Sequence, residues 1–401
     1  MTGMRTVEDH AAQVAALVAA TGSERRRLAD AVGHVLAADL IAPIDLPPFR
    51  NSAMDGYAAR SADLTGFPLE LGVAQDIPAG QGEVAPLTAA TVARIMTGAP
   101  LPLEADTIIP VERTDGGTSR VRIESAPPPG AHVRDRGTDV RIGTAVLHRG
   151  QVVAAPQVGV AAALGVTELE IRTPLRVLVL STGSELVEPG QPLGPGQIYE
   201  SNAAMLAVAV AESGGVPIIA RFVADDVAEF WRALEIAAAD CDLIVTSGGV
   251  SAGAFEVVKD ALSGHGVDFV KVAMQPGMPQ GCGTIEVAGR SIPIVTLPGN
   301  PVSSYVSFEV FLRPAIRAAI GYPQVHRPVL HRQLGETLTS PAGKRQFRRG
   351  VLDEAAGTVA PWGGPGSHLL GWLPGADAMI VIAEDQESLP AGTLVPVWSL
   401  R

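Results

Sequence analysis

The chain has 401 residues, of which 47% are hydrophobic and 18% are charged, and its formal net charge is −12. The hydrophobic content excludes a disordered chain, and the length predicts about two to four domains. The acidic balance argues against a nucleic-acid-binding protein, because such proteins present basic surfaces to phosphates.

The N-terminal segment predicts an amphipathic helix. Residues 7–20 alternate apolar with polar side chains, unlike the uninterrupted apolar stretch of a signal peptide. No apolar run is long and continuous enough to span a membrane, so we expect a cytoplasmic protein without a membrane partner. The two cysteines, Cys241 and Cys282, match no metal-binding spacing and are expected to be buried small side chains.

The following segments mix a helix, a connector and β-structure. Residues 25–36 predict a second helix with Ser23 as its N-cap. Residues 42–49 are rich in proline and predict an extended connector. Residues 66–111 and 119–153 alternate short apolar runs with glycine and proline, which is typical of β-rich structure with tight turns.

From residue 175 the pattern changes to an alternation of strands and helices. Apolar runs predict buried strands at residues 175–180, 216–223, 243–246, 267–273 and 292–297. Helices are expected between them, at residues 201–213, 227–239, 255–262 and 303–320. This alternation predicts a doubly wound parallel sheet with helices on both faces. After Pro323, short runs separated by glycine-rich turns predict a small β domain.

We therefore expect an α/β multidomain protein. Its central part is a doubly wound parallel α/β domain, joined to an N-terminal α+β region, a β-rich lobe and a C-terminal small β domain. The expected boundaries are residues 1–48 with 141–173 for an N-terminal helical and linker domain, 49–140 for the lobe, 174–322 for the α/β domain, and 323–401 for the C-terminal domain.

Three strand ends in the α/β region are small and polar, at residues 181–185, 247–251 and 297–304. Ligands of open α/β sheets bind outside the carboxyl ends of the strands, and glycine lets backbone N–H groups approach an anion. One such turn is explained by ordinary turn chemistry, but three at one edge favour a phosphate or pterin-like ligand. The expected ligand-binding residues are Thr182, Gly183, Ser184, Ser247, Gly248, Gly249, Ser251, Pro298 and Asn300.

Carboxylates follow the same strand ends, at Glu185, Asp225, Asp226 and Glu256. Phosphate chemistry commonly uses Mg²⁺, which takes one or two carboxylates together with waters and phosphate oxygens. Asp226 fits an N-cap of the next helix equally well, and Glu256 also fits a charge in the first turn of a helix.

Six segments stand out along the chain: residues 48–58 (PFRNSAMDGYA), 94–100 (RIMTGAP), 181–186 (STGSEL), 196–202 (GQIYESN), 246–251 (TSGGVS) and 297–304 (LPGNPVSS). Together and in this order they resemble the molybdopterin molybdenumtransferase family, the bacterial MoeA proteins and the E domains of homologues such as gephyrin. The resemblance implies an α/β domain of the molybdopterin-binding type. It also implies that adenylylated molybdopterin and molybdate react to give the molybdenum cofactor and AMP, with Mg²⁺.

The resemblance also implies a homodimer, with each active site between the α/β domain of one chain and the N-terminal part of the other. The implied catalytic residues are Asp225, Glu185, Thr97, Asp139 and Asp55. The implied metal ligands are Glu256 and Asp225, and the implied oxyanion ligands are Lys271, Arg349 and Ser367. Arginine suits such a ligand because its fork of donors matches a tetrahedral dianion.

Several positions depart from the family pattern. Glu256 stands where the family has Asp, Gln275 and Met278 replace common lysines, and Arg50 stands where many members have Asp. These departures leave open an altered oxyanion preference, such as tungstate. Two other functions remain open: a molybdopterin adenylyltransferase, which is also a possible pathway partner, and a non-catalytic scaffold or cofactor carrier.

Overall fold

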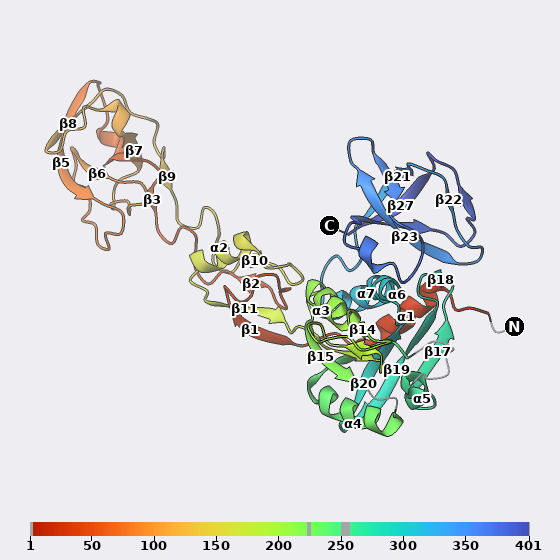
Figure 1. Ribbon diagram of the computed structural model, residues 1–401. Coiled ribbons are helices and arrows are strands. Elements are labelled where there is room, and N and C mark those ends of the chain that lie inside the picture. Colours follow the sequence, from red (N-terminus) through yellow and green to blue (C-terminus); the bar gives the residue numbers. More distant parts are fainter. Residues whose placement is uncertain (1–2, 223–225, 250–256, 401) are drawn as a thin grey trace.

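The computed structural model describes residues 3–222, 226–249 and 257–400. Figure 1 shows a small lobe at the end of a long arm, far from a compact body in which an α/β domain lies against a C-terminal β domain. None of the helices in these ranges has the length and apolar character needed to cross a membrane.

The lobe at the end of the arm is a five-stranded sheet in the order β7-β4-β6-β5-β8. Both faces of the sheet are covered, because Tyr57 and Ala59 point into one apolar cluster and Ala58 into another. Strands β3 (Asn51–Ser52) and β9 (Val133–Arg134) pair where the chain enters and leaves the lobe. The sheet strands are β4 (Gly56–Ala59), β5 (Leu69–Ile77), β6 (Thr91–Ile95), β7 (Thr107–Pro110) and β8 (Arg120–Ile123).

The arm itself consists of short antiparallel pairs. Strand β1 (Ser23–Arg27) pairs with β11 (Glu168–Arg172), β2 (Leu40–Ile41) pairs with β10 (Ala145–Leu147), and α2 (Ala155–Ala163) packs beside them. The helix expected at residues 25–36 is wrong. Pairing with a strand more than a hundred residues away in sequence overrides the local helix propensity.

The α/β domain is built on a six-stranded sheet in the order β15-β12-β16-β20-β19-β17. The four strands from β15 to β20 are parallel, as predicted, but β19 was not predicted and runs antiparallel to both of its neighbours, β20 and β17. The purely parallel sheet is therefore wrong at this edge. Ala288 and Gly289 both have positive φ, and such a two-residue turn joins β19 to β20 as a hairpin. The strands are β12 (Arg176–Thr182), β15 (Val216–Phe222), β16 (Leu243–Ser247), β17 (Val267–Lys271), β19 (Pro279–Val287) and β20 (Arg290–Leu297).

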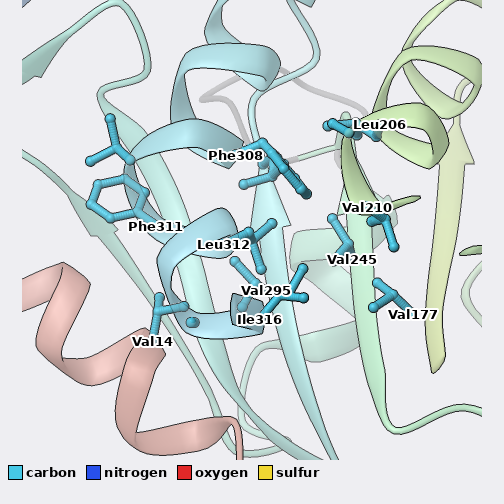
Figure 2. Packing of buried hydrophobic residues seen from close by; sticks show 14 of the residues in the cluster. Val14, Val177, Leu206, Val210, Val245, Val295, Phe308, Phe311, Leu312 and Ile316 are labelled. Carbon is cyan, nitrogen blue, oxygen red and sulfur yellow. The ribbon is translucent and has the colours of Figure 1, made fainter. Parts of the chain in front are cut away.

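Helices cover both faces of this sheet. Along β12, Val177 and Val179 point into one cluster, while Leu178 and Leu180 point into the other. Figure 2 shows the first cluster, in which Val14 of the N-terminal helix reaches the core of the α/β domain. The helices on this side are α1 (Val7–Leu17), α3 (Asn202–Glu212), α6 (Pro301–Ser307), the π-helical η4 (Phe308–Leu312) and α7 (Arg313–Ile320); α4 (Val227–Ala237) and α5 (Val257–Leu262) cover the other.

The C-terminal β domain is a small closed sheet, since β23 pairs with both β24 and β25. A short strand of the α/β domain, β18 (Met274–Gln275), adds to its edge beside Arg345 and Gln346 of β23. The two domains are thus joined by backbone hydrogen bonds as well as by the chain. The strands are β21 (Val329–Leu334), β23 (Arg345–Asp353), β24 (Thr358–Pro361), β25 (Ala378–Ile382) and β27 (Leu394–Ser399), with β22 (Leu338–Thr339) pairing with β26 (Ser388–Leu389).

Candidate active site

A cavity of about 1130 Å³ lies between the α/β domain and the C-terminal β domain. The carboxyl ends of β12, β16 and β20 form one side, so the three polar turns expected at this edge do meet in one place. The loop at residues 365–370 and Lys344 form the opposite side. Among the expected ligand-binding residues, those that line the cavity are Thr182, Gly183, Ser184, Ser247, Gly248, Gly249, Pro298, Asn300 and Ser367.

The turn after β16 requires glycine at positions 248 and 249. Gly248 and Gly249 have φ values of 97° and 67°, which place them in the left-handed region. A Cβ atom on Gly248 would lie 2.9 Å from the carbonyl oxygen of Thr182, and one on Gly249 would lie 2.8 Å from Cγ2 of Val258. The turn is therefore packed tightly between β12 and α5, with its backbone facing the cavity.

One side chain ties two of the turns together. The Asn202 Nδ2 group donates to the Ser247 hydroxyl at 2.8 Å and to the Gly299 carbonyl at 2.7 Å. Ser247 Oγ lies 3.3 Å from Ser304 Oγ, and both serines are buried. Ser247, expected to contact a ligand, is thus also part of the scaffold that holds the cavity floor.

Glu200 ties the third turn to α3. Its Oε1 atom accepts hydrogen bonds from the Ser181 hydroxyl and from the Ala203 backbone N–H, both at 2.8 Å. The residue is 8% exposed and lines the cavity. Asn202 Oδ1 and Thr182 Oγ1 are also buried, and neither has a partner among the described residues. These two atoms are available to a ligand.

The opposite side of the cavity joins the two domains. Asn300 Nδ2 donates to Ser367 Oγ at 3.0 Å, and the Val302 N–H donates to the Ser367 carbonyl at 3.1 Å. Gln275 lines the cavity and accepts a hydrogen bond from Gln346 at 2.8 Å. Met278 lines the same side.

Two of the expected oxyanion ligands do not line the cavity. Lys271 is exposed at the end of β17, and its side chain is not part of the wall. Arg349 is 4% exposed, and its guanidinium donates to backbone carbonyls of the C-terminal domain. The positive charge at this wall comes instead from Lys344, which sequence reasoning missed.

The expected residues of the N-terminal part lie outside the cavity. Asp55 Oδ1 accepts hydrogen bonds from the Thr97 backbone N–H and hydroxyl, both at 2.7 Å, and these bonds lower the pKa of Asp55. Both residues are on the lobe, and Asp139 is exposed and follows β9, the strand with which the chain leaves the lobe. In Figure 1 the lobe lies far from the α/β domain and the C-terminal β domain, between which the cavity of the same chain lies.

Three expected residues, Asp225, Ser251 and Glu256, lie outside the described residues. Asp226 is the N-cap of α4, where its carboxylate accepts the Glu229 N–H at 2.9 Å. Within residues 3–222, 226–249 and 257–400, no three His, Cys, Asp or Glu side chains gather as a metal cluster. Glu185 and Glu200 are carboxylates that line the cavity in these ranges.

The cysteines are buried, as predicted, and unpaired. Burial raises the pKa of both Cys241 and Cys282 to about 11, so neither is a thiolate near neutral pH.

Several cavity residues were not predicted as site residues, among them the polar side chains of Glu200, Asn202, Lys344 and His368. The first two belong to the polar segment at residues 196–202, so a signal for them was present in the sequence. Lys344 and His368 belong to turns of the C-terminal β domain. Nothing local in these turns predicts that they reach an α/β edge.

Three family models match successive parts of the chain: the MoeA N-terminal region (domain I and II) at residues 5–165, a probable molybdopterin-binding domain at residues 178–318, and the MoeA C-terminal region (domain IV) at residues 331–400. The chain is 53% identical to molybdopterin molybdenumtransferase 2 of Mycobacterium tuberculosis strain H37Rv, over 99% of this chain and 100% of that protein. It is 34% identical to the molybdopterin molybdenumtransferase of Haemophilus influenzae, over 94% of each. A crystal structure of the molybdopterin biosynthesis MoeA protein of Pyrococcus horikoshii superposes with a TM-score of 0.85, at 29% identity over 100% of both chains.

Proposed function

The chain belongs to the molybdopterin molybdenumtransferase (MoeA) family, and we propose that it inserts molybdenum from molybdate into adenylylated molybdopterin with release of AMP. This reaction is the last step of molybdenum cofactor biosynthesis. The enzyme is a transferase, and its substrates are molybdopterin-adenylate and molybdate.

The observation that carries this proposal is the cavity between the two domains. Its volume of about 1130 Å³ is at or above the upper end of the roughly 300–1000 Å³ of common ligand pockets. A pterin joined to an adenylate is a large ligand with several phosphate oxygens. Two of the polar turns, those after β12 and β16, offer it hydroxyls and closely approaching backbone groups, as at Ser184 and Gly248.

We place the organic ligand on the α/β side of the cavity and molybdate on the C-terminal side. Lys344 and the Ser367 hydroxyl supply a positive charge and a donor there. Since Arg349 and Lys271 lie off the wall, we assign the oxyanion to Lys344 and Ser367. Gln275 and Met278 line the same wall without charge, so Lys344 carries more of the electrostatic attraction.

The carboxylates at the strand ends fit a divalent cation. Mg²⁺ needs only one or two carboxylates and keeps several waters, so a cluster of three side chains is unnecessary. Glu185 and Glu200 line the cavity, and we propose that Asp225 and Glu256 complete the set. When bound, Mg²⁺ would polarise the phosphoanhydride and activate water for its hydrolysis. Glu200 would also orient the turn after β12 through Ser181.

We further propose that the protein acts as a homodimer in the cytoplasm and receives its substrate from the adenylyltransferase of the same pathway. The distance between the lobe and the cavity supports the dimer, because Asp55 and Thr97 do not reach the cavity of their own chain. A second copy would bring its lobe to that cavity. Asp139, which follows the lobe, would then belong to the same composite site.

The test is an activity assay with the purified full-length protein, adenylylated molybdopterin, Mg²⁺ and molybdate. We expect AMP release and formation of cofactor that activates an apo-molybdoenzyme. AMP release no greater than without protein would overturn the proposal. A second assay with ATP and molybdopterin separates the alternatives, since only an adenylyltransferase would form the adenylylated product.

A further inference from the structure

The C-terminal wall of the cavity carries two titratable side chains in the described ranges, Lys344 and His368. His368 directly follows Ser367 in the glycine-rich loop at residues 362–369. Its side chain is exposed and lines the cavity, and no hydrogen bond or ion pair joins it to another described residue. Both nitrogens of its imidazole ring are therefore free to meet a ligand.

The place of this ring is set by the backbone around it. The Ser367 carbonyl accepts the Val302 N–H at 3.1 Å, and Ser367 Oγ accepts a hydrogen bond from Asn300 at 3.0 Å. The ring lies close to the backbone of Gly366, since a Cβ atom at that position would be 3.1 Å from Cε1 of His368. His368 is thus held next to the hydroxyl to which we assign the oxyanion.

The other titratable groups of the cavity in the described ranges are less suited to passing a proton at this wall. Glu200 accepts two hydrogen bonds at Oε1, and the Tyr199 hydroxyl donates to a backbone carbonyl at 3.0 Å. Glu185 belongs to the turn after β12, on the α/β side. Lys344 shares the wall, but an ammonium group holds its proton near neutral pH. An imidazole both gives and takes a proton in this range.

The chemistry of the proposed reaction requires such a group. When molybdate binds the dithiol of molybdopterin, two Mo–S bonds form and one Mo–O bond breaks. One molybdate and one dithiol give the dithiolene-bound metal with three oxygen atoms and one water, and molybdenum keeps its oxidation state. The two thiol groups supply the two protons of that water. An oxide ion is a poor leaving group until it is protonated, so a proton carrier at this oxygen accelerates the step.

We propose, on the basis of the proposed function, that His368 is a catalytic residue that protonates the leaving oxygen of molybdate. Its imidazolium gives a proton to an oxygen of the anion held by Lys344 and Ser367, and the ring then regains a proton from a thiol of the dithiol. The second proton passes from the other thiol. Ser367 and Lys344 hold the anion, while His368 moves the proton.

The charges around the loop fit this role. The guanidinium groups of Arg348 and Arg349 donate to carbonyls of the loop, and Lys344 lies in the same wall. These cations attract the molybdate dianion. The bound dianion in turn favours the charged form of a neighbouring imidazole. Glu185 and Glu200 line the α/β side of the cavity.

The experiment measures single-turnover formation of cofactor by the full-length protein with adenylylated molybdopterin, Mg²⁺ and a series of molybdate concentrations. The variant H368Q keeps an N–H donor but cannot pass a proton. We expect its rate at saturating molybdate to fall about 100-fold, with little change in the molybdate concentration that gives half of the maximal rate. Loss of an anion ligand would raise that concentration instead. H331Q is the matched control, because His331 of β21 is exposed and does not line the cavity; it should match the wild type.

Two further measurements separate proton transfer from a structural role. In the wild type, the rate at saturating molybdate should fall as the pH rises through the titration of an imidazole, since the protonated form is the acid. This fall should be absent in H368Q. Added imidazole should raise the rate of H368A about tenfold or more, whereas sodium chloride at the same concentration should not.

A rate of H368Q within about twofold of the wild type, or a loss that saturating molybdate restores, would overturn the proposal. A fall with pH that is unchanged in H368Q would overturn it as well. Far-UV circular dichroism shows whether each variant is folded, and H368N together with the imidazole response of H368A decides if H368Q is not. An inactive wild type would overturn the proposed function and this inference with it, whereas an active wild type with an unimpaired H368Q would overturn the inference alone.

Discussion

The two walls of the cavity are built in different ways. The α/β wall consists of short turns at the ends of paired strands, where packing leaves no room for a Cβ atom and buried side chains such as Asn202 tie the turns together. The C-terminal wall is one glycine-rich loop that depends on the contacts of Arg349 and Ser367. A wall made by packing is expected to fail with the fold, whereas a wall held by a few hydrogen bonds can fail alone.

The strongest way to break the α/β wall is Gly248→Ala. The left-handed φ and the 2.9 Å approach of a Cβ to the Thr182 carbonyl together cost about 4 kcal/mol. We expect a matching loss of unfolding free energy in urea and a loss of AMP affinity in calorimetry. Gly264→Ala is the matched control, because Gly264 also has positive φ but open space around its Cβ. Equal losses in both variants would show that the packing of the turn is unimportant.

The different construction of the two cavity walls explains how much of the site could be predicted from sequence. Parallel strands end at one edge of a sheet, so the local turns at Thr182 and Gly248 were placed together from the order of elements alone. Lys344 and His368 reach the cavity because the C-terminal sheet closes on itself and hydrogen bonds, such as that from Arg349 to the Leu369 carbonyl, hold the loop at residues 362–369. That arrangement depends on pairings distant in sequence, as does the strand found where a helix was expected at residues 25–36.

Lowering the pH tests whether the α/β domain can be destabilised while the glycine-rich loop of the C-terminal domain is left unchanged. His10 of α1 is fully buried against Phe311, and burial lowers its pKa from 6.5 to about 4. Because the folded-state pKa is lower, the neutral histidine favours folding above pH 6.5, and this contribution is lost as the pH falls from 6.5 toward 4. The expected loss is about 3 kcal/mol.

Urea unfolding across this pH range measures the slope. The variant His10→Gln should show a shallower slope than the wild type, since it lacks the titrating group. Identical slopes in the two proteins would place the acid sensitivity elsewhere.

Asn202→Ala tests the tie between two turns of the α/β wall. It removes the donors to Ser247 and to the Gly299 carbonyl, and a buried acceptor left without a partner costs about 2 kcal/mol. We expect that loss in urea unfolding together with weaker AMP binding. Ser304→Ala is the control, because Ser304 touches the same network without tying two turns. If Asn202→Ala binds AMP as the wild type does, the turns hold their positions by packing alone.

The smallest effect on stability is expected at the lobe. In the proposed dimer the lobe contributes to the cavity of the second chain. The Asp55 carboxylate is exposed and accepts hydrogen bonds from Thr97, so Asp55→Asn should change the unfolding free energy by less than about 0.5 kcal/mol and leave AMP binding intact. In the proposed dimer its AMP release should nevertheless fall about tenfold or more, because the lobe completes the partner's cavity.

Mixing the Asp55→Asn and Gly248→Ala proteins and allowing their subunits to exchange tests whether the lobe of one chain serves the cavity of the other. Half of the dimers are mixed and each has one intact composite site, which predicts about a quarter of the wild-type activity. A mixture no more active than its components would mean that the lobe serves its own chain or none.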